Sequence, residues 1–187
     1  MTAAQMTTEL MWKAALVAAV VDAALLLLIR RVVTPERFGR LKWPAAGVTA
    51  LFFGGVWTFA MWGYWWELAY HYVFPDWART VVPPAYGLMF GAVGLAAWWL
   101  ARRARGVPGV VFCLLGGVVS LPGHMWAFYG RGMLTKVPIL RGVSDVSALV
   151  FGVFEFTAYF SGILLAAFVF QGAVERRRTR APAKPGI

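Results

Sequence analysis

The chain has 187 residues, of which 60% are hydrophobic and 14% are charged, whereas soluble domains carry about 25% charged residues. A soluble fold of this length could not bury that much apolar surface, so the composition excludes a soluble domain and predicts an integral membrane protein. Lys and Arg outnumber Asp and Glu by 18 to 8, but these cations lie between and after the apolar segments. There they orient a membrane protein and contact anionic lipids, and we expect no binding of nucleic acid.

The apolar segments predict an all-α, polytopic membrane bundle with about five transmembrane helices, because a helix needs about 20 mostly apolar residues to cross a bilayer. In chain order the five segments are Leu10–Ile29, Ala45–Phe74, Tyr86–Ala101, Val107–Phe128 and Val143–Ala173. In this interpretation residues 1–175 form one transmembrane domain and residues 176–187 form a basic, disordered cytoplasmic tail. The first segment has no basic region before it and no convincing cleavage site, so we expect it to be retained as a helix.

The distribution of Lys and Arg predicts the orientation of the bundle. Of these 18 residues, 13 lie in three segments: residues 30–42, residues 102–105 and the tail after Glu175. Cytoplasmic connections of membrane proteins are rich in Lys and Arg, so we expect these segments in the cytoplasm and the N-terminus outside. This pattern requires an odd number of spans, which five helices satisfy. The expected location is a bacterial plasma membrane.

The first two segments each carry an acidic residue, Asp22 and Glu67. A charge inside the bilayer costs at least about 2.5 kcal/mol, so an intramembrane carboxyl group is a candidate for function. Without a cationic partner such a group is expected to stay neutral, and a neutral carboxylic acid can donate a proton. Helical spacing places Glu67 and His71 on one face, so we expect a hydrogen bond between them. The alternatives are a hydrogen bond between helices for either acid and, for Asp22, a contact with the nearby cytoplasmic arginines.

Proline and glycine mark the third and fourth segments. Pro83 and Pro84 are expected in the connection before the third helix. Within that helix, Gly87 and Gly91 have the spacing that lets two helix backbones approach closely. We expect these glycines to pack inside the bundle, and contact between two copies of the chain in a homo-oligomer is the alternative. Pro122 lies inside the fourth segment and should kink it.

The fifth segment contains a third acidic candidate, Glu155. With the orientation above, Glu155, Glu67, His71 and His124 all belong to the outer half of the membrane and could line one pocket. The aromatic residues expected at the same level, as the wall of that pocket, are Trp65, Trp66, Tyr70, Trp126, Tyr129, Phe156 and Tyr159. Electron-rich ring faces stabilise a cation placed over them. The alternative is an aromatic belt at the membrane interface.

The second segment resembles a known family in a short motif. Trp66-Glu67, Tyr70 and Phe74-Pro75 are similar to a Trp-Glu pair, a following aromatic residue and a helix-ending proline in one group of enzymes. These enzymes are the membrane-integral terpene cyclases of fungal meroterpenoid and indole-diterpene pathways, which have bacterial relatives. The resemblance implies that Glu67 and a later acid protonate an epoxide or alkene of a polyprenyl chain, which then closes into rings through carbocations.

The expected function is therefore that of a membrane-embedded cyclase or isomerase of isoprenoids. Glu67 would donate the proton and His71 would hold and recharge it, with Glu155 as the second acid and Asp22 in reserve. Two alternatives stay open. A b-type haem held between His71 and His124 would transfer electrons, and a noncatalytic subunit or small transporter would use the acids for packing only.

Metals and cofactors are not expected for the cyclase. The eight acidic residues are scattered, so no aspartate-rich motif is present that could bind a magnesium diphosphate. The single cysteine, Cys113, cannot form an intramolecular disulfide. The expected partners are a hydrophobic small-molecule substrate and anionic lipids at the basic side of the bundle.

Overall fold

The computed structural model describes residues 7–42, 47, 60, 62–119 and 121–180. Within these residues every regular element is helical and no strand occurs, which confirms the predicted all-α class. Four of the described helical stretches are long and apolar enough to cross a membrane: Thr8–Val32, Ala78–Ala101, Pro108–Gly130 and Asp145–Arg177. They correspond to the first, third, fourth and fifth predicted segments.

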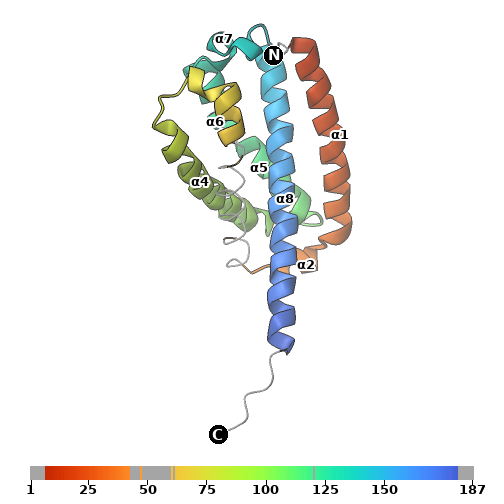
Figure 1. The fold of residues 1–187 in the computed structure, drawn as a ribbon. Helices are drawn as coiled ribbons and strands as arrows, with labels where there is room; N and C mark the ends of the chain where they lie inside the picture. The colour runs from red at the N-terminus through yellow and green to blue at the C-terminus, as the bar shows by residue number, and fades with distance from the viewer. Residues whose placement is uncertain (1–6, 43–46, 48–59, 61, 120, 181–187) are drawn as a thin grey trace.

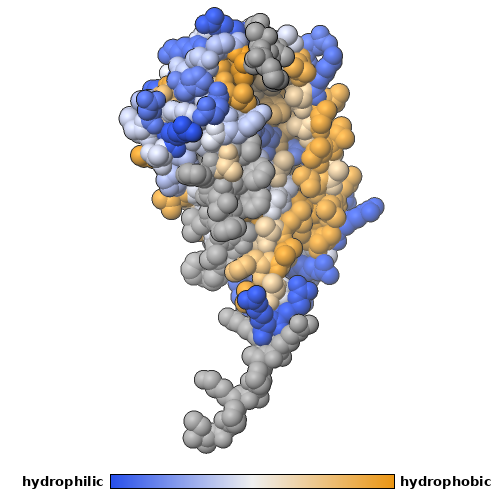
Figure 2. Space-filling view, in the orientation of Figure 1, coloured by the Kyte–Doolittle hydropathy of each residue, from blue (hydrophilic) through white to orange (hydrophobic). Residues whose placement is uncertain are grey.

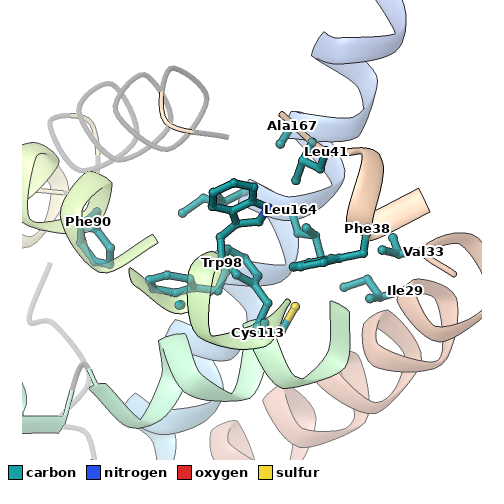
Figure 3. Packing of buried hydrophobic residues seen from close by; sticks show 14 residues of the cluster. Ile29, Val33, Phe38, Leu41, Phe90, Trp98, Cys113, Leu164 and Ala167 are labelled. Carbon is teal, nitrogen blue, oxygen red and sulfur yellow. The ribbon is translucent and has the colours of Figure 1, made fainter. Parts of the chain in front are cut away.

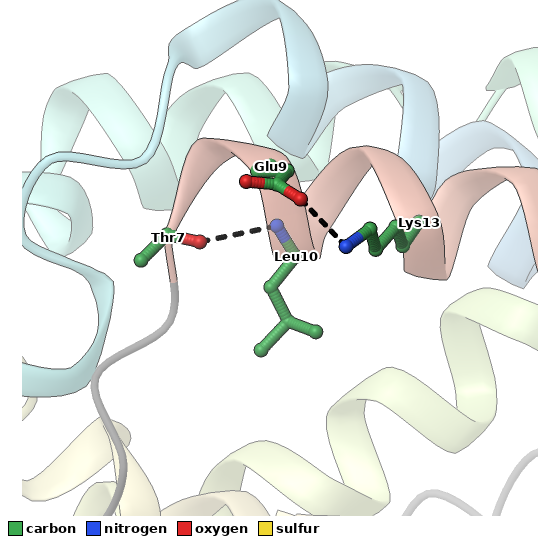
Figure 4. A network of polar contacts seen from close by, with 4 residues as sticks. All are labelled: Thr7, Glu9, Leu10 and Lys13. Carbon is green, nitrogen blue, oxygen red and sulfur yellow. Dashed lines mark hydrogen bonds and ion pairs between the residues drawn. The ribbon is translucent and has the colours of Figure 1, made fainter.

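The first predicted segment forms α1, Thr8–Val32. Thr7 caps its first turn, because the Thr7 hydroxyl accepts a hydrogen bond of 3.1 Å from the backbone N–H of Leu10. Glu9 lies in the same turn, where the helix dipole favours an acid, and pairs with Lys13 at 2.6 Å (Figure 4). Both charged side chains are exposed, so the cap does more than the ion pair to fix where the helix begins.

A short helix, α2 at Pro35–Arg40, follows α1. Thr34 caps it by accepting a hydrogen bond of 3.3 Å from the N–H of Arg37, and Pro35 suits the first helical position, which needs no backbone donor. Phe38 is buried, with its ring centroid 6.4 Å from that of Phe112. The apolar side of α2 therefore anchors the basic segment 30–42 to the rest of the bundle.

Most of the second predicted segment lies outside the described residues. Its described end is helical at 62–68 and then continues as a short 3-10 helix, Tyr70–Tyr72. The change occurs at Ala69, whose φ of −145° and ψ of −45° are not helical. The regular helical spacing that predicts a contact between Glu67 and His71 is therefore interrupted between the two residues.

The third predicted segment is α4, which runs over Ala78–Ala101 and includes Pro83 and Pro84. The prediction that these prolines lie in a connection is therefore wrong. Proline removes a backbone donor, but side chains and neighbouring helices can satisfy the freed carbonyl groups of a membrane-spanning helix. At the start of α4 the hydroxyl of Thr80 donates to the carbonyl of Trp77 at 3.1 Å.

The fourth predicted segment is described as two helices, α5 at Pro108–Val119 and α6 at Leu121–Met125. A π-helical turn, Trp126–Gly130, follows directly. Pro122 lies in α6. Residue 120 between the two helices lies outside the described residues, so the kink stays a prediction. The connection to the last helix contains α7, Met133–Lys136, and a 3-10 turn, Pro138–Leu140.

The fifth predicted segment is α8, Asp145–Arg180. At a rise of 1.5 Å per residue its length is about 54 Å, which exceeds the bilayer core of about 30 Å. Its C-terminal part projects beyond the other helices (Figure 1). The predicted disordered tail starts at residue 176, but α8 stays helical through Arg180, and the rest of the tail, residues 181–187, lies outside the described residues.

Glycines let α5 pack closely against both α1 and α8. A Cβ atom on Gly109 would lie 2.9 Å from Cγ2 of Ile29 on α1, and a Cβ atom on Gly116 would overlap the ring of Phe160 on α8. The core that these helices enclose is shown in Figure 3. Its buried residues come from all the long helices and from α2, and they include Ile29, Val33, Phe38, Leu41, Phe90, Trp98, Phe112, Cys113, Leu164 and Ala167.

Hydrogen bonds join α1 and its continuation to α8 at both ends of the bundle. At one end the hydroxyl of Thr8 donates to the carbonyl of Gly142 at 2.8 Å and accepts from the N–H of Ser144 at 2.9 Å. At the other end the Gln171 side chain accepts from the N–H of Lys42 and donates to the carbonyl of Arg40. α1 and α8 therefore run parallel. Hydrophobic residues cover the flank that they form, and hydrophilic residues gather toward the ends (Figure 2).

Candidate functional site

The pair formed by Glu155 and Tyr159 lies inside the span of α8. The phenol of Tyr159 donates a hydrogen bond of 2.6 Å to Oε1 of Glu155, and both side chains are half-buried. The two residues are four positions apart, which is the spacing at which side chains on one helix face meet. Both ion pairs found among the described residues involve other acids, so no described cation pairs with Glu155. An acid and a hydroxyl donor are thus held together in the membrane-spanning region.

Aromatic rings continue from this pair toward the core. The ring of Phe156 meets that of Tyr159 edge to face, with centroids 5.5 Å apart, and stacks on Phe90 of α4 at 5.4 Å. Phe90 in turn contacts Phe160, which contacts Phe112 of α5. Ring faces of this kind attract a positive charge. Electron-rich rings therefore lie close to the acid along α8 and in the core that α8 packs against.

Glu67, the expected proton donor, does not lie in the interior of the described bundle. Its side chain is 68% exposed, and its Oε1 pairs at 3.2 Å with the guanidinium of Arg79, which is 58% exposed. The opposite face of the same helix is buried and carries Trp62 and Trp66, and Ala69 after it is buried as well. The prediction of a buried Glu67 without a cationic partner is therefore wrong, because this helix turns Glu67 outward and the first turn of α4 supplies a cation.

His71 does not hold the acid either. Its Nδ1 donates a hydrogen bond of 2.7 Å to the carbonyl of Trp66, and its ring packs on Tyr72 with centroids 3.9 Å apart. The side chain is exposed. The cause is the break at Ala69, which turns His71 away from Glu67. The expected hydrogen bond between these two residues is therefore replaced by one to the backbone.

The aromatic cluster at this end of the bundle already contains a cation. Its rings contact one another with centroids 4.3 to 6.4 Å apart; they are Trp62, Trp65, Trp66, Tyr70, Phe74 and Trp126. The guanidinium of Arg131 lies 5.1 Å from the ring of Phe74 and 5.7 Å from that of Trp126. It also donates from Nε and Nη2 to the carbonyl of Val73. Trp126, one of the residues expected to stabilise a substrate cation, thus lies beside a cation of the protein.

Two further residues of the predicted site lie apart from Glu155. Trp126 and Tyr129 are 52% and 49% exposed on the π-helical turn. The side chain of His124 lies outside what the structure describes. The single pocket expected from the sequence is therefore divided, with the aromatic cluster at one end of the bundle and Glu155 within the span.

Asp22 lies on the buried side of α1, on a different helix from Glu155 and Glu67. Its side chain is 3% exposed, and neither carboxyl oxygen has a hydrogen-bond partner among the described residues. The expected contact with the cytoplasmic arginines is absent from the ion pairs of the described chain. The three predicted acids therefore do not share one site within the described structure.

No protein-family model, curated protein or solved structure matches this chain. The resemblance of the motif around Trp66 and Glu67 to membrane-integral terpene cyclases therefore stays a prediction. Sequence reasoning missed the roles of two arginines. Arg79 pairs with Glu67, and Arg131 lies over rings of the aromatic cluster. Both cations belong to the side of the bundle that is predicted to be poor in Lys and Arg. A cation in such a segment could have indicated that it has a specific partner.

Proposed function

We propose that this chain is a membrane-embedded enzyme that protonates a lipophilic isoprenoid substrate, with Glu155 as the acid. The observation that carries the proposal is the hydrogen bond from Tyr159 to Glu155 within a membrane-spanning helix. Aromatic rings lie beside this pair and no described cation neutralises it. This assignment replaces Glu67, which is exposed and paired with Arg79.

The proposed step is general acid catalysis. Glu155 in its neutral form transfers its proton to an alkene or epoxide of the substrate, which becomes a carbocation and closes into a ring or isomerises. The final cation loses a proton from carbon to water, and water returns a proton to the Glu155 carboxylate. Between these steps Tyr159 donates its hydrogen bond to a carboxylate, and such a charge-assisted bond is stronger than the bond to the neutral acid. Tyr159 thus stabilises the product of proton transfer more than the starting state, which is the requirement for catalysis. Phe156 and Phe90 shelter the cation.

A noncatalytic membrane subunit is the second candidate. It is favoured by the two cations that complete internal contacts, Arg79 with Glu67 and Arg131 with the aromatic cluster. In this alternative the hydrogen bond between Tyr159 and Glu155 only satisfies a polar group within the bilayer.

The proposed orientation has the basic end of the bundle in the cytoplasm of a bacterial cell and the start of α1 outside. The basic end carries the cations of residues 30–42, 102–105 and 176–177. Arg102 lies over the ring of Trp98 and Arg103 over that of Trp99, a geometry that suits the lipid headgroup region. Anionic lipids are the proposed partners of this end.

The test is conversion of isoprenoid substrates by the purified protein in lipid nanodiscs. Linear polyprenyl alkenes and their terminal epoxides are supplied to the wild type, to Glu155→Gln and to Glu67→Gln, with Glu9→Gln as an exposed control. We expect a cyclised or isomerised product from the wild type, loss of at least about 100-fold in rate for Glu155→Gln, and near wild-type rates for the other two. Loss of activity in Glu67→Gln with retention in Glu155→Gln would overturn the assignment. No product from any substrate would favour the noncatalytic subunit.

A further inference from the structure

Asp22 lies in the middle of the surface by which α1 contacts the bundle. The buried residues of α1 form one stripe along the helix: Met11, Ala15, Asp22 and Ile29. The other faces of α1 are exposed and apolar, for example at Leu16, Val17 and Val20. Every other member of the stripe is hydrophobic, so Asp22 is the one ionisable group on this contact surface.

The surroundings of Asp22 do not compensate a negative charge. Its two carboxyl oxygens are shielded from solvent and have no hydrogen-bond partner within the described chain. The described ion pairs join Lys13 to Glu9 and Arg79 to Glu67, so neither brings a cation to Asp22.

Two neutral polar groups complete this junction of α1, α5 and α8. The thiol of Cys113 on α5 interacts electrostatically with Asp22, and Ser161 on α8 is a neighbour of this thiol. The Ser161 hydroxyl donates its hydrogen to the carbonyl of Thr157 at 2.8 Å. Cys113 and Ser161 are both 0% exposed. A thiol and an occupied hydroxyl supply weak dipoles, which cannot replace the water that a carboxylate loses on burial.

We propose that Asp22 is a proton-binding site at the α1–α5–α8 junction, and that its carboxyl group carries a bound proton in the folded protein at neutral pH. A buried carboxylate without a partner costs far more free energy than the neutral acid. The proposed ligand is a proton because both carboxyl oxygens are shielded from solvent. This site is separate from the Glu155–Tyr159 pair and does not depend on the proposed reaction.

Infrared spectroscopy of protein labelled with ¹³C in the aspartate side chains tests the proposal. The chain has three aspartates, and the other two, Asp76 and Asp145, are exposed. These two residues serve as the controls for the assignment of the labelled bands. We expect an additional labelled band of a neutral carboxylic acid, and we expect this band to be missing in Asp22→Asn. A wild-type spectrum with labelled carboxylate bands only would overturn the proposal.

The wild-type spectrum decides the question even if Asp22→Asn does not fold. In that case Asp76→Asn and Asp145→Asn, which change exposed residues, supply the assignment. The neutral-acid band should keep its full intensity in both variants. Loss of the band in either variant would assign the proton to that residue and overturn the proposal for Asp22.

Discussion

Tyr159 and Glu155 lie one turn apart on α8 and are joined by a hydrogen bond of 2.6 Å from the phenol to the carboxyl group. Because both residues belong to one helix, the helix geometry itself brings them together. The pair therefore forms whenever α8 forms, and it does not depend on how the other helices are placed. What the other helices add is the aromatic surface that begins with Phe90.

Replacing Tyr159 by Phe tests the part that its hydroxyl plays in the proposed reaction. We expect kcat to fall about 10-fold, which corresponds to about 1.4 kcal/mol of lost stabilisation of the developing carboxylate. KM should stay near the wild-type value, because the ring and its packing on Phe156 are retained. Steady-state kinetics in nanodiscs measures both quantities. Tyr64→Phe, which removes an exposed hydroxyl, is the matched control, and an equal kcat for wild type and Tyr159→Phe would contradict the role.

Gly116 is expected to be the least replaceable glycine of the contact between α5 and α8. A Cβ atom there would overlap the buried ring of Phe160, so Gly116→Ala should lower the free energy of unfolding by about 1–3 kcal/mol. Gly172→Ala is the control, because nothing lies within 4 Å of its Cβ position. The free energy of unfolding of this control should stay unchanged or rise by up to about 1 kcal/mol, because alanine has a higher helix propensity than glycine. Unfolding titrations in mixed micelles measure both changes, and equal stabilities would mean that α5 and α8 are further apart.

Arg131 is expected to stabilise the connection that follows the π-helical turn. Arg131→Gln loses the charged hydrogen bonds to the Val73 carbonyl and the ring contacts with Phe74 and Trp126. Together these should cost about 2 kcal/mol of the free energy of unfolding. Lys136→Gln, at an exposed position of the same connection, should change it by less than about 0.5 kcal/mol. A stability of Arg131→Gln equal to that of Lys136→Gln would show that the guanidinium contacts contribute nothing.

The proposed orientation predicts which exposed positions a reagent outside the cell can reach. In a Cys113→Ser background, Lys136→Cys should react with a membrane-impermeant maleimide in intact cells. Arg105→Cys, in the basic turn after α4, should react only after the membrane is permeabilised. Both native residues are exposed, so accessibility within the protein does not limit either reaction. The reverse labelling pattern would place the basic end outside and contradict the distribution of cations as an orientation signal.

The helical class and most of the long helices could be predicted from the sequence, because twenty apolar residues in a row have few alternatives to a membrane helix. The helix ends were harder to predict. Pro83 and Pro84 suggested a connection, yet α4 starts at Ala78, because a membrane helix tolerates proline better than a soluble one. α8 ends at Arg180, so its last residues belong to the segment that was predicted to be a disordered tail.

The candidate site was predicted less well, and Glu67 shows why. Helical spacing predicts which residues share a face of the helix, but it does not predict which face points into the bundle. The partner of Glu67, Arg79, comes from a different element, and the break at Ala69 separates His71 from the acid. The Glu155–Tyr159 pair, by contrast, depends on spacing within one helix and could have been predicted from that spacing alone.

The most direct test of the central claim follows the proton from Glu155 to the substrate. Conversion of an alkene substrate is carried out in D₂O, and mass spectrometry counts the carbon-bound deuterium in the product. The account predicts one deuterium per product molecule in the wild type and in Glu67→Gln, and no deuterated product above background in Glu155→Gln. Undiminished deuterium transfer by Glu155→Gln would contradict it, because the proton would then come from another group.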